Sequence, residues 1–129
     1  MKIKSLAIVL FVLAINSVSA QSTFDKWPAI KAFHEVMSQT FHPSEEGNLE
    51  PIKTRSEEMA TKAAAILKSD IPEEYKTAAI LASAEKLQLR SKALHKMVLA
   101  KASDADIKKS LADLHDVFHE IVGLCSEKK

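Results

Sequence analysis

The chain is poor in cysteine and glycine. Cys125 is the only cysteine among 129 residues, so no disulfide can form within one molecule. The two glycines, Gly47 and Gly123, are too few for a glycine-rich phosphate-binding loop. No Ser-His-Asp or Cys-His arrangement for nucleophilic catalysis is evident either. An enzyme built on any of these devices is therefore not expected.

Hydrophobic runs long enough to span a bilayer are also missing. The apolar run 6–15 has about half of the ~20 residues that a transmembrane helix needs. Two lysines precede this run, and the small residues Val18 and Ala20 follow it, which is the pattern of a cleaved signal peptide. We expect cleavage before Gln21, export to the periplasm or the cell exterior, and no membrane insertion afterwards.

An excess of charge of one sign is absent from the rest of the chain. Removal of residues 1–20 from the 129 leaves 109, enough for one domain, 21–129, with a hydrophobic core. Without Lys2 and Lys4, 16 of the 18 Lys and Arg side chains remain against 17 Asp and Glu, a formal net charge of −1. This balance provides no attraction for nucleic acid or an anionic membrane. We expect neither as a partner, and the sequence leaves a homodimer open.

Runs of β-branched residues in strict alternation are missing, whereas Ala, Leu, Lys and Glu are abundant. Apolar residues recur at helical spacing in four segments. We expect helices at 25–41, from the Asn48 cap to Lys68, at 72–100, and from the capping pair Ser103 and Asp106 onwards. Short connections between them predict an all-α, up-down-up-down antiparallel four-helix bundle.

Each predicted helix has one apolar stripe that should face the core. The stripes are Trp27, Ile30, Phe33, Met37 and Phe41; Ile52, Met59, Ala63 and Ile66; Ile80, Ala84, Leu87, Leu94 and Val98; and Ile107, Leu111, Leu114, Phe118, Ile121 and Cys125.

Four of the five histidines lie in two short segments at opposite ends of this domain, 33–46 and 115–120. His115 and His119 are four residues apart and therefore share one side of a helix. His34 falls within the apolar stripe of its helix and is expected to point inward.

Helix lengths predict that the two histidine segments meet. The helix 72–100 is longer than the helix before it, which at ~1.5 Å per residue raises the start of the last helix about 10 Å above the end of the first helix. Along the last helix from this start, His119 lies at the level of His34. The first and last helices are also lateral neighbours in an up-down-up-down bundle.

This convergence predicts a transition-metal site. The expected ligands are three histidines and one of two further residues: His34, His115 and His119, completed by His42 or Glu46. Three imidazoles with a carboxylate or water suit zinc, copper, nickel or iron, and the sequence does not choose among these metals.

A simpler interpretation needs no metal. His34 would then be a buried histidine bonded to a backbone carbonyl, while the pair on the last helix flanks an interface. His42 precedes Pro43, which disfavours helix at the preceding residue, so we expect His42 at the exit of the first helix. His95 lies on the third helix and is expected to be structural or exposed. Cys125 is expected to be an inert buried thiol.

An exported four-helix bundle of this size, with ligands on its first and last helices, resembles the cytochrome c′ and cytochrome b562 type of periplasmic protein. The resemblance implies a haem between the helices, with electron transfer or gas binding as the activity. The segment 123–127 reads Gly-Leu-Cys-Ser-Glu where the c′ type has Cys-x-x-Cys-His, which excludes covalent attachment by that motif. A non-covalent haem b with Met37 and His119 as axial ligands stays open. Segments 33–51 and 115–125 also resemble small exported bacterial bundle proteins without a known activity.

Two further classes of helical protein fit the sequence less well. Hemerythrin-like bundles bind two irons through about five histidines and two carboxylates drawn from all four helices. His42 and Glu46 have a suitable spacing, but the predicted helix 48–68 contains no histidine. An exported interaction or chaperone bundle without a cofactor is the remaining alternative.

Overall fold

The computed structural model describes residues 21–127, and every regular element within this range is helical. A helical segment, 21–26, precedes four long helices and one short 3₁₀ helix. They are α2 (Pro28–Glu45), α3 (Glu50–Lys68), η1 (Glu73–Tyr75), α4 (Ala78–Leu99) and α5 (Asp104–Glu127). The predicted all-α class is confirmed. The predicted signal peptide, residues 1–20, lies outside the described residues.

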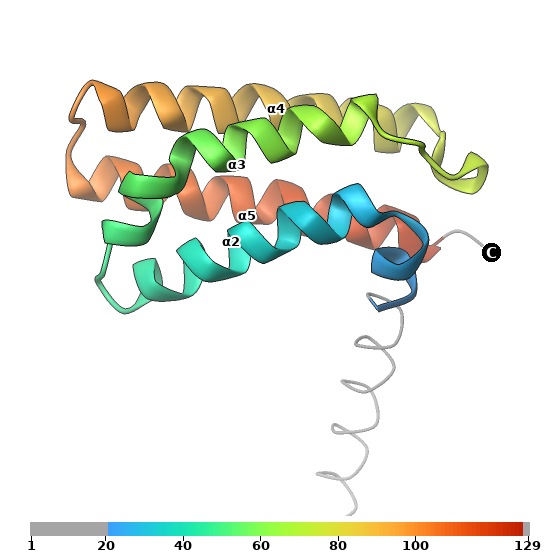
Figure 1. The fold of residues 1–129 in the computed structure, drawn as a ribbon, viewed down its shortest axis with the longest axis horizontal. Helices are drawn as coiled ribbons and strands as arrows, with labels where there is room; N and C mark the ends of the chain where they lie inside the picture. Colours follow the sequence, from blue (N-terminus) through green and yellow to red (C-terminus); the bar gives the residue numbers. More distant parts are fainter. Residues whose placement is uncertain (1–20, 128–129) are drawn as a thin grey trace, which may run out of the picture.

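The four long helices lie side by side (Figure 1). Helices that follow each other in the chain pack extensively, α2 on α3, α3 on α4 and α4 on α5. The first and last long helices, α2 and α5, pack together less extensively. Within residues 21–127, no helix combines the length and the apolar character that crossing a membrane requires.

The core is formed by the predicted apolar stripes. All the predicted stripe residues are buried except Phe41 and Val98, which are half-buried and pack against the core. Burying one Leu, Ile or Phe side chain contributes about 1.5–3 kcal/mol, so this apolar interior is the main source of stability.

The helix α2 differs from the predicted range 25–41 at both ends. It begins at Pro28, because Trp27 has non-helical dihedral angles (φ −131°, ψ 83°) and proline fits the first turn, where no backbone N–H is needed. It continues through Pro43 to Glu45. The prediction that His42 lies at the helix exit is therefore wrong. A proline in the last turn removes one hydrogen bond only, and the Pro43 carbonyl still accepts bonds from the N–H groups of Glu46 and Asn48 at 3.0 and 2.8 Å.

The helix α4 begins at Ala78 rather than at the predicted Pro72. Thr77 caps it, since the Thr77 hydroxyl accepts a hydrogen bond from the Ile80 N–H at 3.1 Å. As a result α4 has 22 residues against 19 in α3, an excess of about 4.5 Å at 1.5 Å per residue. The predicted excess of about 10 Å is too large.

The predicted start of α5 agrees with the structure, whereas α3 is capped at Leu49 and not at the predicted Asn48. Asp106 donates its backbone N–H to the Ser103 hydroxyl at 3.1 Å, as expected for the start of α5. Asn48 accepts a hydrogen bond from the Glu50 N–H at 3.1 Å, next to the Leu49 position where α3 is capped.

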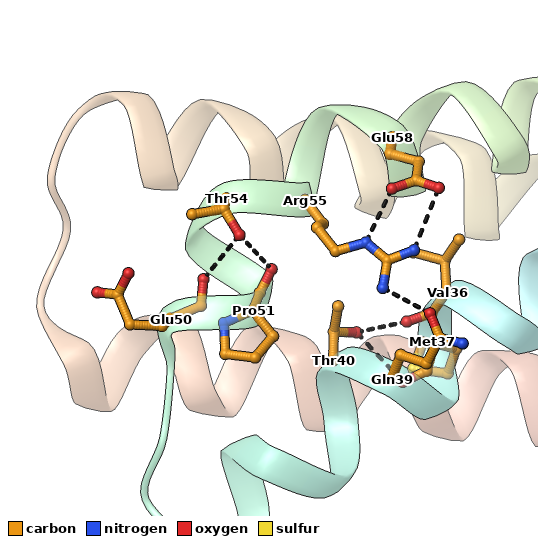
Figure 2. Close-up of polar contacts among 9 residues, drawn as sticks. All are labelled: Val36, Met37, Gln39, Thr40, Glu50, Pro51, Thr54, Arg55 and Glu58. Carbon is orange, nitrogen blue, oxygen red and sulfur yellow. Dashed lines mark hydrogen bonds and ion pairs between the residues drawn. The ribbon is translucent and has the colours of Figure 1, made fainter.

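Polar contacts lie within α2 and α3, and one of them links the two helices (Figure 2). Arg55 of α3 donates to the Gln39 side chain of α2 at 2.6 Å and pairs with Glu58 at 2.8 Å. The buried Thr40 hydroxyl donates to the Val36 carbonyl at 2.9 Å. The Arg55–Glu58 pair lies within α3, and an exposed ion pair of this kind typically contributes less than about 1 kcal/mol to stability.

Cys125 is buried at the core side of α5, as its stripe predicts. Burial raises the pKa of the Cys125 thiol to about 11. The group is therefore a protonated thiol at neutral pH, which is the unreactive form.

Candidate metal-binding pocket

A pocket of about 490 Å³ lies between α2 and α5, where these helices pack less extensively. All four histidines of the two predicted segments line it. The complete lining is Phe24, His34, Met37, Ser38, Phe41, His42, His115, Phe118, His119, Val122, Gly123 and Ser126. The sequence-based prediction that the segments 33–46 and 115–120 meet is therefore consistent with this pocket.

Helical spacing explains why each wall is continuous. On α2, Phe41 and His42 follow His34 by seven and eight residues, about two turns, and so each lies on the same side of the helix as His34. On α5, His115 and His119 are one turn apart and share a face in the same way.

His115 and His119 form the closest pair of candidate ligands. Their Nε2 atoms are 3.2 Å apart, and one ring donates a hydrogen bond to the other. Two nitrogen ligands at ~2.0–2.1 Å from one tetrahedral ion are about 3.3 Å apart. The pair therefore already has the spacing that one bound ion requires.

Phenyl rings orient the histidines on both walls. The His115 ring lies flat on Phe41, with centroids 3.8 Å apart and planes inclined by 5°. The His34 ring stacks on Phe24 at 4.6 Å and on Phe118 at 5.6 Å, and these two phenyl rings are 6.4 Å from each other. His34 is half-buried in this stack rather than enclosed in the helical core, so its expected inward direction holds only in part.

Burial lowers the pKa of both His34 and His115, and the nearby His119 imidazole lowers each pKa further. His42 acts on both rings in the same direction. The four imidazoles are therefore within electrostatic range of one another. His34 and His115 are mainly neutral at neutral pH, which is the form that binds metals.

We expect the metal-free protein to lose stability as the pH falls below the ordinary histidine pKa of 6.5. The lowered folded-state pKa values of His34 and His115 mean that the unfolded chain, with an ordinary histidine pKa of 6.5, binds more protons. Their contribution is fully present above pH 6.5 and is lost as the pH falls through the folded-state values. Urea unfolding with a chelator present, at several pH values, measures the decrease.

The matched variants for this experiment are His115→Gln and His95→Gln. The decrease in the free energy of unfolding should become smaller in His115→Gln than in His95→Gln, whose ring lies outside the pocket. Equal decreases in both variants would contradict the assignment. The lowered pKa values of Glu58 and Glu120 act only below about pH 4.5, outside this window.

The remaining predicted ligands are not brought together with the pair. Within residues 21–127, no three His, Cys, Asp or Glu side chains are placed to hold one ion. His42 is exposed at the edge of the pocket, and Glu46 lies beyond the last residue of α2, outside the lining. A third histidine ligand, His34 or His42, therefore requires a side-chain rotation.

His95 lies outside the pocket, between α3 and α4. Its Nδ1 atom is 2.9 Å from the hydroxyl of the buried Ser56, which gives His95 the structural role expected from the sequence. Glu120 of α5 also points away from the pocket. It accepts a hydrogen bond from Ser83 at 2.5 Å and lies 3.5 Å from the Lys86 ammonium, both on α4.

The aromatic part of the pocket was not predicted from the sequence as part of a site. Phe41 and Phe118 were assigned to the core alone, and Phe24 lies before the first predicted helix. The useful signal was spacing, because Phe118 lies three residues from His115 and beside His119 on the helix surface.

No known protein family matches the chain, and neither a curated protein nor a solved structure is significantly similar to it. The residues and geometry of the pocket are therefore the basis for assigning a function.

Proposed function

We propose that this protein binds one transition-metal ion in the pocket between α2 and α5. His115 and His119 are the anchoring pair, and the 3.2 Å between their Nε2 atoms is the observation that carries the proposal. His34 and His42 line the same pocket and supply the further ligands after rotation. Glu46 ranks behind them because it lies outside the lining.

The chemistry of the pocket supports a metal-binding role. Imidazole nitrogen is a good ligand for zinc, copper, nickel and iron. The pKa values of His34 and His115 are lowered, so binding need not displace a proton from either ring at neutral pH. The phenyl ring of Phe41 stacked on His115 restricts the orientation of this anchoring ligand, which lowers the entropic cost of binding.

We further propose that the four long helices form an up-down-up-down antiparallel bundle in an exported protein. The packing of each long helix on the next supports this topology, as does the contact between α2 and α5. Figure 1 draws successive long helices running in opposite directions, which is consistent with it. Export depends on residues 1–20, which lie outside the described range.

Equilibrium dialysis of the full chain, purified without a His tag, tests the metal proposal. We expect one equivalent of bound metal at micromolar free zinc or copper, reversed by a chelator. Bound metal should also stabilise the fold by about 2.7 kcal/mol when its concentration is 100 times the dissociation constant. Absence of bound metal under these conditions would refute the proposal.

A non-covalent haem b is the second candidate. Met37 and His119, the two axial ligands considered from the sequence, both line the pocket, and phenyl rings form much of its walls. Reconstitution with haem should give a Soret band that changes in His119→Gln. A featureless spectrum removes this candidate. If neither metal nor haem binds, the cofactor-free interaction bundle is the function that is left.

A further inference from the structure

We infer that the pocket prefers cuprous copper to divalent cations. This inference rests on the proposed metal-binding function and adds the identity and oxidation state of the ion. Three features of the pocket support it: the charge of its lining, the number of ligands already in contact, and the presence of a thioether.

The side chains that line the pocket carry no formal charge unless a histidine among them binds a proton. Among the described residues that line the pocket, none is Asp, Glu, Lys or Arg. The Glu45 and Asp116 carboxylates act on His115 from outside the lining. Moving an ion out of water without an anionic ligand costs free energy that grows with the square of its charge, so this pocket disfavours a dication more than a monocation.

The arrangement of ligands also fits a cuprous ion. One pair, His115 and His119, is in contact, and no three His, Cys, Asp or Glu side chains converge within residues 21–127. Divalent zinc prefers four ligands in a tetrahedron. Cuprous copper is stable at lower coordination numbers and therefore needs less rearrangement of this pocket.

The third feature is Met37, which lines the pocket on α2 three residues from His34. A helix places residues at this spacing on the same side. Thioether sulfur is a soft ligand that favours cuprous copper over zinc and other harder divalent ions. Two imidazoles with one thioether form a neutral donor set, in which Met37 would be the third ligand.

The test compares cuprous copper and zinc on the full chain without a tag. Cuprous copper is titrated under anaerobic conditions with ascorbate against the chelator bicinchoninate, and zinc against a zinc-binding dye. Met37→Leu removes the sulfur and nearly conserves the volume. Met59→Leu is the matched control, because Met59 is as buried as Met37 but belongs to the core outside the pocket lining.

We expect tighter binding of cuprous copper than of zinc. Met37→Leu should weaken cuprous copper at least about 10-fold, leave zinc within about 2-fold, and remove the sulfur scatterer from the copper X-ray absorption spectrum. Met59→Leu should change none of these values. Tighter binding of zinc, or an equal loss for both metals in Met37→Leu, overturns the inference and leaves the proposed function intact. Failure of every metal to bind overturns both.

Discussion

His119→Gln is expected to lower metal affinity by at least about 100-fold. The substitution removes one nitrogen of the only imidazole pair in direct contact among the described residues, and it leaves His115 as a single ligand on α5. Loss of a group that merely orients a metal ligand already costs about 10- to 100-fold, so loss of an anchoring ligand should cost at least as much. Competition titration of the purified variant measures the change.

His95→Gln is the matched control for this substitution. It changes the same residue type to the same amide, in a histidine that contacts Ser56 rather than the pocket. We expect its metal affinity to equal that of the unmodified chain. If the two variants lose affinity to the same extent, the pocket is not the binding site.

Phe118→Ala should lower the free energy of unfolding by about 3–5 kcal/mol. The Phe118 side chain is 3% exposed, and its ring lies 5.4 Å from that of Phe33 and 5.6 Å from that of His34. Its removal leaves a cavity where the core meets the pocket wall. Because small domains are stable by only about 5–15 kcal/mol, urea unfolding should shift strongly to lower concentrations.

Phe41→Ala gives the comparison for that effect. Phe41 also stacks on a pocket histidine, but it is half-buried and removes less apolar surface from water. We expect a clearly smaller loss of stability than for Phe118→Ala. A larger loss for Phe41→Ala would mean that the pocket wall, rather than the core beneath it, holds α2 and α5 together.

Apolar periodicity predicted most of the fold. The stripe residues of α5, for example, are all buried, because a helix of 24 residues provides many repeats of the same pattern. The errors in helix bounds occurred at three prolines, Pro28, Pro43 and Pro72, where a single residue decides the outcome. Local rules for proline do not include the hydrogen bonds available nearby, such as those the Pro43 carbonyl accepts.

The predicted meeting of the two histidine segments agrees with the pocket because two errors in predicted helix length have opposite signs. The helix α4 exceeds α3 by about 4.5 Å rather than about 10 Å. The helix α2, however, continues four residues beyond the predicted end at Phe41, a rise of about 6 Å. These changes nearly cancel, so His119 still lies close to the level of His34. The orientation of each ring could not be predicted, since it depends on stacking with phenyl rings from other turns and helices.

The thin contact between α2 and α5 has a consequence for how an ion would be released. The proposed ligands of the ion lie on two helices, α2 and α5, at opposite ends of the described chain. The contact between these two helices is the least extensive one between neighbouring long helices. An ion bound by residues of both helices would hold α2 and α5 together at this contact. Handing the ion on would then require only that α2 and α5 part slightly, with every helix and its backbone hydrogen bonds left intact.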